Sequence, residues 1–232
     1  MAKHLFSQRF FFRCVKFVLA LLLLPVLIGL VNAFWRFLSA HGKVSLSEIW
    51  FISGFFIFPV IYYLQVLPGH IYVFGHEITH AMWVYLFKGK IKKISVSSSS
   101  GSVLTTKNNF LISLAPYFFP FYTFLIILIF YLLALIFDVA IWINWLFFFV
   151  GFTYSFHILL TLDVLMSEQS DIEDTGRFFS WVIILILNIS VTSVIIKFVE
   201  PDVINLREFF SYALRFSGKT YNTIMQYLLQ KL

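Results

Sequence analysis

Two histidines and a glutamate stand close together in an apolar stretch of this chain, in the order His76-Glu77-Ile78-Thr79-His80. On a helix, residues four apart project from the same face, so both imidazoles can reach one tetrahedral metal ion. Glu77 lies about 100° further round the helix, where its carboxylate can act on a water molecule at the metal. A buried polar network of the same three residues is the plainer alternative. Because a divalent cation offsets the cost of hiding these groups in apolar surroundings, we expect His76 and His80 to bind Zn²⁺ and Glu77 to act as the catalytic base.

A catalytic zinc ion normally has three protein ligands, so a third ligand must come from elsewhere in the chain. Asp171 is the candidate we favour, because it follows a polar break at residues 167–170 where a carboxylate can turn inward; a helix N-cap is its structural alternative. Asp174 is a second candidate. Asp163 and His157 lie inside an apolar run, six residues apart and so on different faces of a helix. Three further acidic residues in this part of the chain are weaker candidates: Asp138, Glu168 and Glu173.

The elements that must position these residues are typical of a membrane protein. The chain has 232 residues, of which 60% are hydrophobic and 12% charged, and its mean hydropathy is +0.90. Ordinary soluble domains are about 45–50% apolar and 25% charged, so a soluble globule is excluded. A single cysteine, Cys14, cannot form an internal disulfide bond. The formal net charge of +6 comes from Lys and Arg in the tails and loops, which indicates contact with membrane phosphates and control of topology, not nucleic-acid binding.

Six apolar runs approach the length that crosses a bilayer. They cover residues 17–37, 49–67, 71–87, 110–137, 141–165 and 178–199. Pro68-Gly69 ends the second run, and Pro116 and Pro120 predict a kink in the fourth. Residues 88–109 are polar and basic, with a weak alternation that predicts one or two short strands or a hairpin. We therefore expect an all-α polytopic membrane protein with about six transmembrane helices and a short strand-like or re-entrant segment after the helix that carries the histidines.

The distribution of basic residues complicates the orientation. The basic N-terminal tail indicates a cytoplasmic N-terminus, yet six simple crossings would place the lysine-rich residues 88–107 outside, against the positive-inside tendency. We therefore expect the third helix or the segment after it to enter and leave on one side, where protein or water covers its backbone.

The region around the histidines resembles a known family. It contains the string Phe74-Gly75-His76-Glu77-Ile78-Thr79-His80-Ala81, a basic strand-like stretch after Gly89, and Leu114-Ala115-Pro116 in an apolar run. Over residues 71–177 this pattern is similar to the site-2-protease family of intramembrane zinc metallopeptidases. The resemblance implies that His76, His80 and a later aspartate, at Asp171, hold the zinc ion and that Glu77 activates water. The family's Asn-Pro-x-x-x-x-x-Asp-Gly pattern is absent at Asp171, and Asp174-Thr175-Gly176-Arg177 is similar to its Asp-Gly-Gly-Arg ending, so Asp174 stays open as the third ligand.

The resemblance implies an intramembrane zinc metalloendopeptidase that holds one Zn²⁺ per chain and cleaves peptide bonds in or near transmembrane segments, as in regulated intramembrane proteolysis. Its partners would be a transmembrane protein substrate and the lipid bilayer, with no nucleic acid, and its location a bacterial inner (cytoplasmic) membrane. We expect three parts: a basic tail with two transmembrane helices (1–70), a metalloprotease-like core (71–199) and an amphipathic basic tail (200–232). A non-proteolytic metal-binding or transport protein and an inactive protease-like scaffold are the alternatives.

Overall fold

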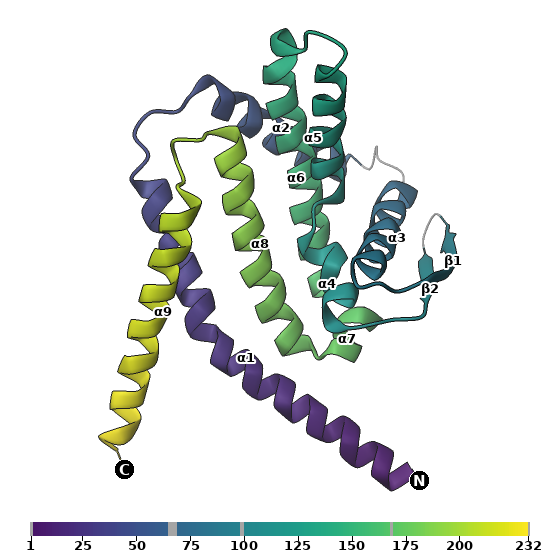
Figure 1. Cartoon of the computed structure of the whole chain (residues 1–232), viewed down its shortest axis with the longest axis vertical. Coiled ribbons are helices and arrows are strands. Elements are labelled where there is room, and N and C mark those ends of the chain that lie inside the picture. Colours follow the sequence, from purple (N-terminus) through teal and green to yellow (C-terminus); the bar gives the residue numbers. More distant parts are fainter. Residues whose placement is uncertain (1, 65–68, 98–99, 168, 232) are drawn as a thin grey trace. The chain divides into compact units, whose positions relative to one another are not determined.

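The computed structural model describes residues 2–64, 69–97, 100–167 and 169–231, and most of these residues are helical (Figure 1). Along the chain the elements are α1 (Ala2–Ser39), α2 (Leu46–Tyr63), α3 (Gly69–Leu86), β1 (Ile91–Val96), β2 (Gly101–Thr105), α4 (Phe110–Phe118), α5 (Phe121–Ala134), a 3₁₀ helix η1 (Ala140–Trp142), α6 (Ile143–Met166), α7 (Ser170–Thr175), α8 (Arg177–Val199) and α9 (Leu206–Leu229). This order agrees with the expected class, a mainly helical protein with a small strand segment.

Within the described residues, four helices are long and apolar enough to cross a membrane. They are Phe11–Ser39, Leu46–Tyr63, Ala140–Met166 and Arg177–Val199, and the bent pair α4 and α5 makes a fifth if it counts as one span. Helix α3 is 18 residues long, but its histidines, glutamate and threonine keep it below the hydropathy of these spans. Several long apolar helices thus fit an integral membrane protein, whereas the expected count of about six is not confirmed.

The kink predicted in the fourth apolar run is confirmed. Helices α4 and α5 meet at an angle of 70° across Phe119 and Pro120. Phe119 has φ −103° and ψ 104°, as expected for a residue that precedes proline, because the proline ring disfavours the helical conformation at that position. Pro116, the other proline of the predicted kink, lies inside α4 and does not end it. The break predicted at Pro68-Gly69 lies partly outside the described residues, and α3 begins at Gly69.

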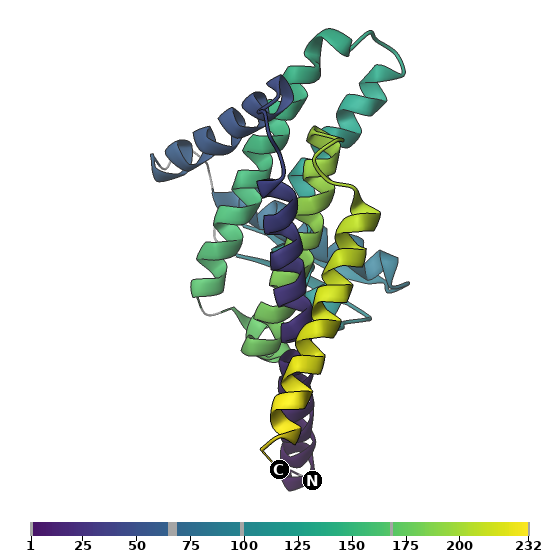
Figure 2. The same cartoon turned by 90° about the vertical axis from the view of Figure 1, so that its left-hand side faces the viewer.

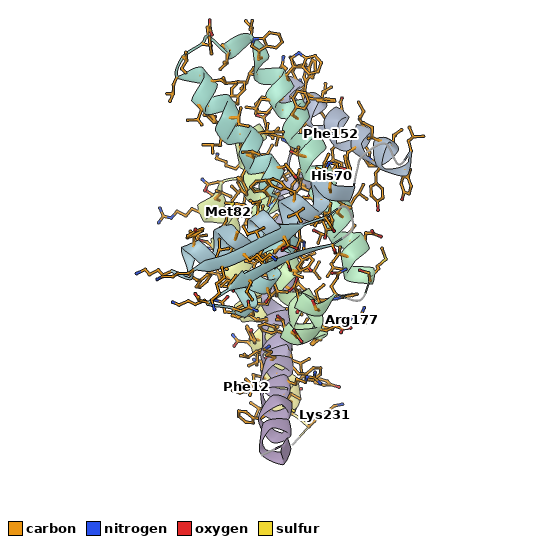
Figure 3. All side chains as sticks on the ribbon, turned by 90° about the vertical axis from the view of Figure 1, so that its right-hand side faces the viewer. Phe12, His70, Met82, Phe152, Arg177 and Lys231 are labelled. Atoms are coloured by element: carbon orange, nitrogen blue, oxygen red, sulfur yellow. The ribbon has the colours of Figure 1, made fainter. Side chains whose placement is uncertain are left out.

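The strand prediction for residues 88–109 is also confirmed. Strands β1 and β2 form an antiparallel hairpin in which Ile94 pairs with Val103 and Val96 pairs with Gly101. The register shifts between Ile91 and Lys93, which marks an irregularity in β1. Both strands run beside α3 (Figure 3). The hairpin therefore covers the helix that carries the histidines.

The contacts divide the chain into two compact units, Met1–Lys43 with Ile172–Leu232 (unit 1) and Val44–Asp171 (unit 2). In unit 2 the strongest packing joins α2 to α6, where two glycines let the backbones approach closely. A Cβ atom at Gly54 would lie 2.8 Å from the carbonyl carbon of Phe148, and one at Gly151 would lie 2.9 Å from that of Phe51. Only residues without a side chain fit such a contact, as is common between membrane helices.

Unit 1 consists of α1, α8, α9 and most of α7. A core cluster of unit 1 joins Leu30 and Ala33 of α1 to Phe209 and Ala213 of α9. The expected parts, residues 1–70, 71–199 and 200–232, follow the composition of the chain and stay a prediction. In the structure α1 packs against α8 and α9, and α2 packs against α6.

Candidate metal centre

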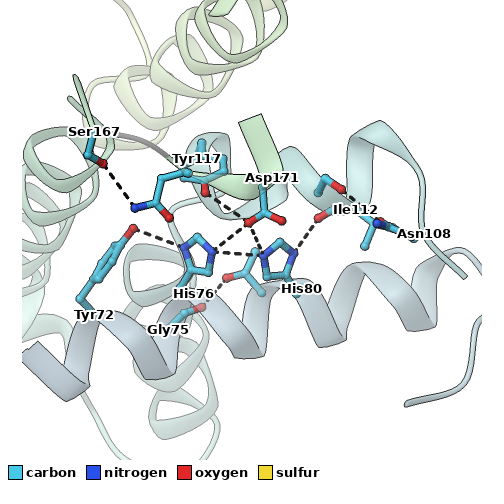
Figure 4. Close-up of polar contacts among 12 residues, drawn as sticks. Tyr72, Gly75, His76, His80, Asn108, Ile112, Tyr117, Ser167 and Asp171 are labelled. Carbon is cyan, nitrogen blue, oxygen red and sulfur yellow. Dashed lines mark hydrogen bonds and ion pairs between the residues drawn. The ribbon is translucent and has the colours of Figure 1, made fainter. Parts of the chain in front are cut away.

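Helix α3 presents two imidazoles on one face. His76 and His80 are four residues apart, and their Nε2 atoms lie 3.1 Å from each other (Figure 4). Both side chains are 12% exposed. Between them, the Thr79 hydroxyl donates to the Gly75 carbonyl oxygen one turn earlier over 2.7 Å, as threonine does within a helix. The predicted helical geometry of the motif is therefore present.

A carboxylate from a distant part of the chain completes the group. Asp171 lies in α7, shortly after α6 ends at Met166 and Ser167 takes an extended backbone conformation. Its Oδ2 atom lies 3.3 Å from His80 Nε2 and 3.6 Å from His76 Nε2. All three residues belong to unit 2. In the part of the chain that the structure describes, these are the residues of His, Cys, Asp and Glu type that gather closely enough to hold a metal ion.

The spacing of the three donor atoms fits a tetrahedral metal. Bonds of about 2.0–2.1 Å from zinc to nitrogen and oxygen place neighbouring ligands of a tetrahedron about 3.3 Å apart. The observed edges of 3.1, 3.3 and 3.6 Å lie around that value. Two nitrogens and one carboxylate oxygen are also a donor set that zinc accepts. The residues present therefore fit such an ion.

Hydrogen bonds outside the group orient its members. His80 Nδ1 lies 2.8 Å from the Ile112 carbonyl oxygen, which can only accept, so this nitrogen carries the proton. In the neutral imidazole Nε2 is then left with a free lone pair that faces Asp171. His76 Nδ1 lies 3.4 Å from the Tyr72 hydroxyl, and Tyr117 donates to Asp171 Oδ2 over 3.3 Å (Figure 4). Hydrogen-bond partners outside a metal site fix the tautomer and the orientation of the side chains that bind the metal.

The charge state of Asp171 suits a ligand. Burial raises the pKa of its carboxyl group, but when no metal ion is bound and the imidazoles are protonated at Nε2, the hydrogen bonds and positive charge of His76 and His80 outweigh burial, so the pKa lies below its ordinary value. The carboxylate is therefore ionised at neutral pH.

Glu77 lies at a cavity next to these residues. Its side chain is 6% exposed and lines a cavity of about 230 Å³ together with His80 and Asp171. Strand β2 supplies part of the wall through Ser102, Val103 and Thr105. A Cβ atom at Gly101 would lie 2.5 Å from Glu77 Oε1 and 2.7 Å from its carboxyl carbon. The backbone of β2 therefore packs directly on this carboxylate.

The alternative third ligands lie elsewhere. The exposed Asp163 accepts a hydrogen bond from Tyr62 over 3.3 Å and is not part of the group. Asp174 is exposed, and its backbone carbonyl accepts from Lys16 Nζ at 3.5 Å. His157 is buried and lines a second, water-sized cavity of about 30 Å³ with His76, but it does not belong to the donor cluster.

The weaker candidates take no part in the group either. Asp138 accepts from the Ala140 backbone nitrogen over 3.2 Å, as a turn residue does, and Glu173 is exposed. Glu168 lies outside the described residues. The structure thus brings together the three residues we favoured as ligands and places Glu77 beside them.

The sequence analysis did not predict four groups that contact the site residues. Tyr72 is four residues before His76, so its place on the same helix face gave a usable signal. Tyr117, the Ile112 carbonyl and Gly101 gave none, because each reaches the site only through the packing of α4 or β2 against α3.

Comparisons of this chain with protein-family models, with curated proteins and with solved structures find no match. The geometry of the site and the chemistry of its residues are therefore the basis for a function.

Proposed function

We propose that this protein is an intramembrane zinc metalloendopeptidase similar to the site-2-protease family, with His76, His80 and Asp171 as zinc ligands and Glu77 as catalytic base. The observation that carries the proposal is the convergence of three metal donors on one point, with a buried carboxylate next to them at a cavity. A polar network that served only stability would not need this free space beside the donors.

The protein's own residues account for the proton transfers of peptide hydrolysis. When bound, a zinc ion polarises a carbonyl group and lowers the pKa of water to about 7. Glu77 takes the proton of the attacking water and later passes it to the leaving amine. The Ile112 carbonyl and Tyr72 hold the two imidazoles in place, and Tyr117 holds the Asp171 carboxylate. These contacts keep the groups of the site aligned.

The hairpin suits the delivery of an extended substrate. A transmembrane helix has all its backbone groups paired, so it must unwind before it can be cut. Strand β2 lines the cavity at Glu77, and a two-stranded sheet keeps outer edges to which an unwound segment can add as a further strand. We therefore propose substrates whose membrane segments contain Gly, Pro or Asn, which weaken a helix.

The setting in the membrane completes the proposal. The four long apolar helices and the bent pair fit an integral membrane protein. We propose that α3 is a further, more polar membrane segment shielded by protein, which brings the count to about six, and that the host is a bacterial inner membrane.

The test compares wild type with Glu77→Gln after purification in detergent. Zinc is determined by elemental analysis, and cleavage is followed on a co-expressed single-pass membrane protein whose span contains Gly, Pro or Asn. We expect one zinc ion per chain in both proteins and a loss of cleavage in the variant of at least about 100-fold, because only the proton carrier is removed. Glu173→Gln removes an exposed carboxylate and is the matched control.

Unchanged cleavage by Glu77→Gln would remove the protease proposal. Zinc in a wild type that cleaves nothing would favour metal binding or transport, and a wild type that neither binds zinc nor cleaves would favour a scaffold.

A further inference from the structure

A cationic pocket lies between two helices of unit 1, and the proposed protease activity makes no use of it. Arg36 of α1 lines this pocket together with four residues of α9, and its volume is about 260 Å³. The residues of α9 are Tyr212, Arg215, Phe216 and Lys219. Their spacing of three, four and seven places them on one face of the helix. Three positive charges from two helices therefore converge on one cavity.

Among the described residues, no acidic group neutralises the positive charge of this pocket. No carboxylate lines the cavity, and within the described ranges none of its three cations lies at ion-pair distance from an acidic side chain. The guanidinium of Arg36 instead lies 4.4 Å from the centre of the Tyr212 ring, whose hydroxyl donates to Asn32 over 2.9 Å. Like charges gathered without a counter-charge repel one another, so the pocket suits an anion.

The pocket is located at one end of a membrane span. The apolar segment Phe11–Ser39 ends just beyond Arg36, and the neighbouring Trp35 is 72% exposed, as expected for an aromatic residue at a membrane interface. Helix α9 runs back along α1, because Phe209 contacts Phe37, Tyr212 contacts Asn32 and Tyr221 contacts Leu22 (Figures 1 and 2).

Because α9 runs antiparallel to α1, Arg215 and Lys219 lie further into the membrane span than Arg36. Lys219 follows Tyr212 by seven residues, which is about 10 Å further along the span at 1.5 Å per residue. Charged side chains at such a depth reach back toward the headgroups, where phosphate solvates them. Arg215 and Lys219 share one cavity with Arg36, as this behaviour predicts.

We propose that this pocket binds the phosphate headgroup of an anionic phospholipid, with its acyl chains along the exposed apolar surface of α1. Guanidinium groups match phosphate oxygens in charge and geometry, and an ammonium group adds a third contact. Ile28 and Val31 of α1 are 48% and 51% exposed, so they offer apolar surface within the same span. A lipid is favoured over a soluble phosphate because the pocket adjoins this span.

The experiment measures lipid binding by native mass spectrometry of the full chain released from detergent. The probes are phosphatidylglycerol, phosphatidylcholine and inorganic phosphate. We expect phosphatidylglycerol to bind at least about 10-fold more tightly than phosphatidylcholine, and the double variant R215Q/K219Q to lose most of that preference. The matched control, K92Q/K93Q, removes two charges from β1 and is expected to keep it.

If both double variants lost the preference for phosphatidylglycerol equally, the preference would depend only on net charge, and the proposal would be overturned. Equal binding of the two lipids, or displacement of phosphatidylglycerol by millimolar inorganic phosphate, would also overturn it. The single variant Arg36→Gln gives a second reading if the double variant unfolds, since it must lower the preference for phosphatidylglycerol as well. Circular dichroism identifies any unfolded variant.

Discussion

The two compact units of this chain place their ionisable residues in opposite ways. In unit 2, His76, His80 and Asp171 form one group in which two basic imidazoles lie beside an acidic carboxylate, although Asp171 is distant in the sequence. Unit 1 gathers like charges instead, with Arg36, Arg215 and Lys219 at a single cavity. Mixed donors at metal-bonding distances are suited to chemistry, whereas unneutralised cations at the end of a span are suited to an anion. The arrangement of charges, more than their number, therefore separates the proposed reactive site from the proposed binding surface.

The strongest way to break this comparison is to remove the acid of unit 2. We expect Asp171→Ala to lower zinc affinity by more than the 10- to 100-fold that loss of an outer-sphere partner costs, because Asp171 is a direct ligand in the proposed site. Competition with a fluorescent chelator measures the affinity. Asp163→Ala and Asp174→Ala are the controls and should bind zinc as wild type does. If Asp174→Ala lost zinc instead, the third ligand would be misassigned.

Gly101 offers a sharper test of the cavity wall. A methyl group at this position would collide with the Glu77 carboxylate, although its backbone conformation is open to other residues. We expect Gly101→Ala to keep its zinc and to lose about 10- to 100-fold in cleavage rate, because a small displacement of the base is costly. Gly42→Ala, which meets no atom within 4 Å, should be as active as wild type. A fully active Gly101→Ala would show that Glu77 tolerates movement.

The smallest expected effect concerns the framework of unit 2. Gly54→Ala inserts a methyl group against the Phe148 backbone, so we expect a loss of about 1–3 kcal/mol in the free energy of unfolding. In α9, Gly218 has open space around it, and Gly218→Ala should stabilise by about 0.5–1 kcal/mol through helix propensity. Thermal unfolding followed by circular dichroism shows whether each variant is less or more stable than the wild type. A stabilised Gly54→Ala would contradict the close approach of α2 and α6.

Local features of this fold could be predicted from the sequence because they depend on neighbouring residues. The spacing of His76 and His80, the extended conformation before Pro120 and the hairpin after α3 are of this kind. The acidic member of the proposed metal site was harder to predict, because Asp171 follows His80 by 91 residues. Only the packing of α6 and α7 determines which carboxylate lies beside the histidines. The pairing of α1 with α9 has the same origin. The rest of the fold and of the site depends on tertiary contacts, which no local sequence pattern predicts.

We propose that His76, His80 and Asp171 hold one zinc ion beside Glu77. X-ray absorption at the zinc edge of the zinc-loaded protein tests it most directly, because it counts the imidazoles around the metal. We predict two imidazole nitrogens and a carboxylate oxygen at about 2.0–2.1 Å in the wild type, with one imidazole lost in His80→Ala and none in His157→Ala. A zinc environment without imidazole, or one that His80→Ala leaves unchanged, would contradict the claim.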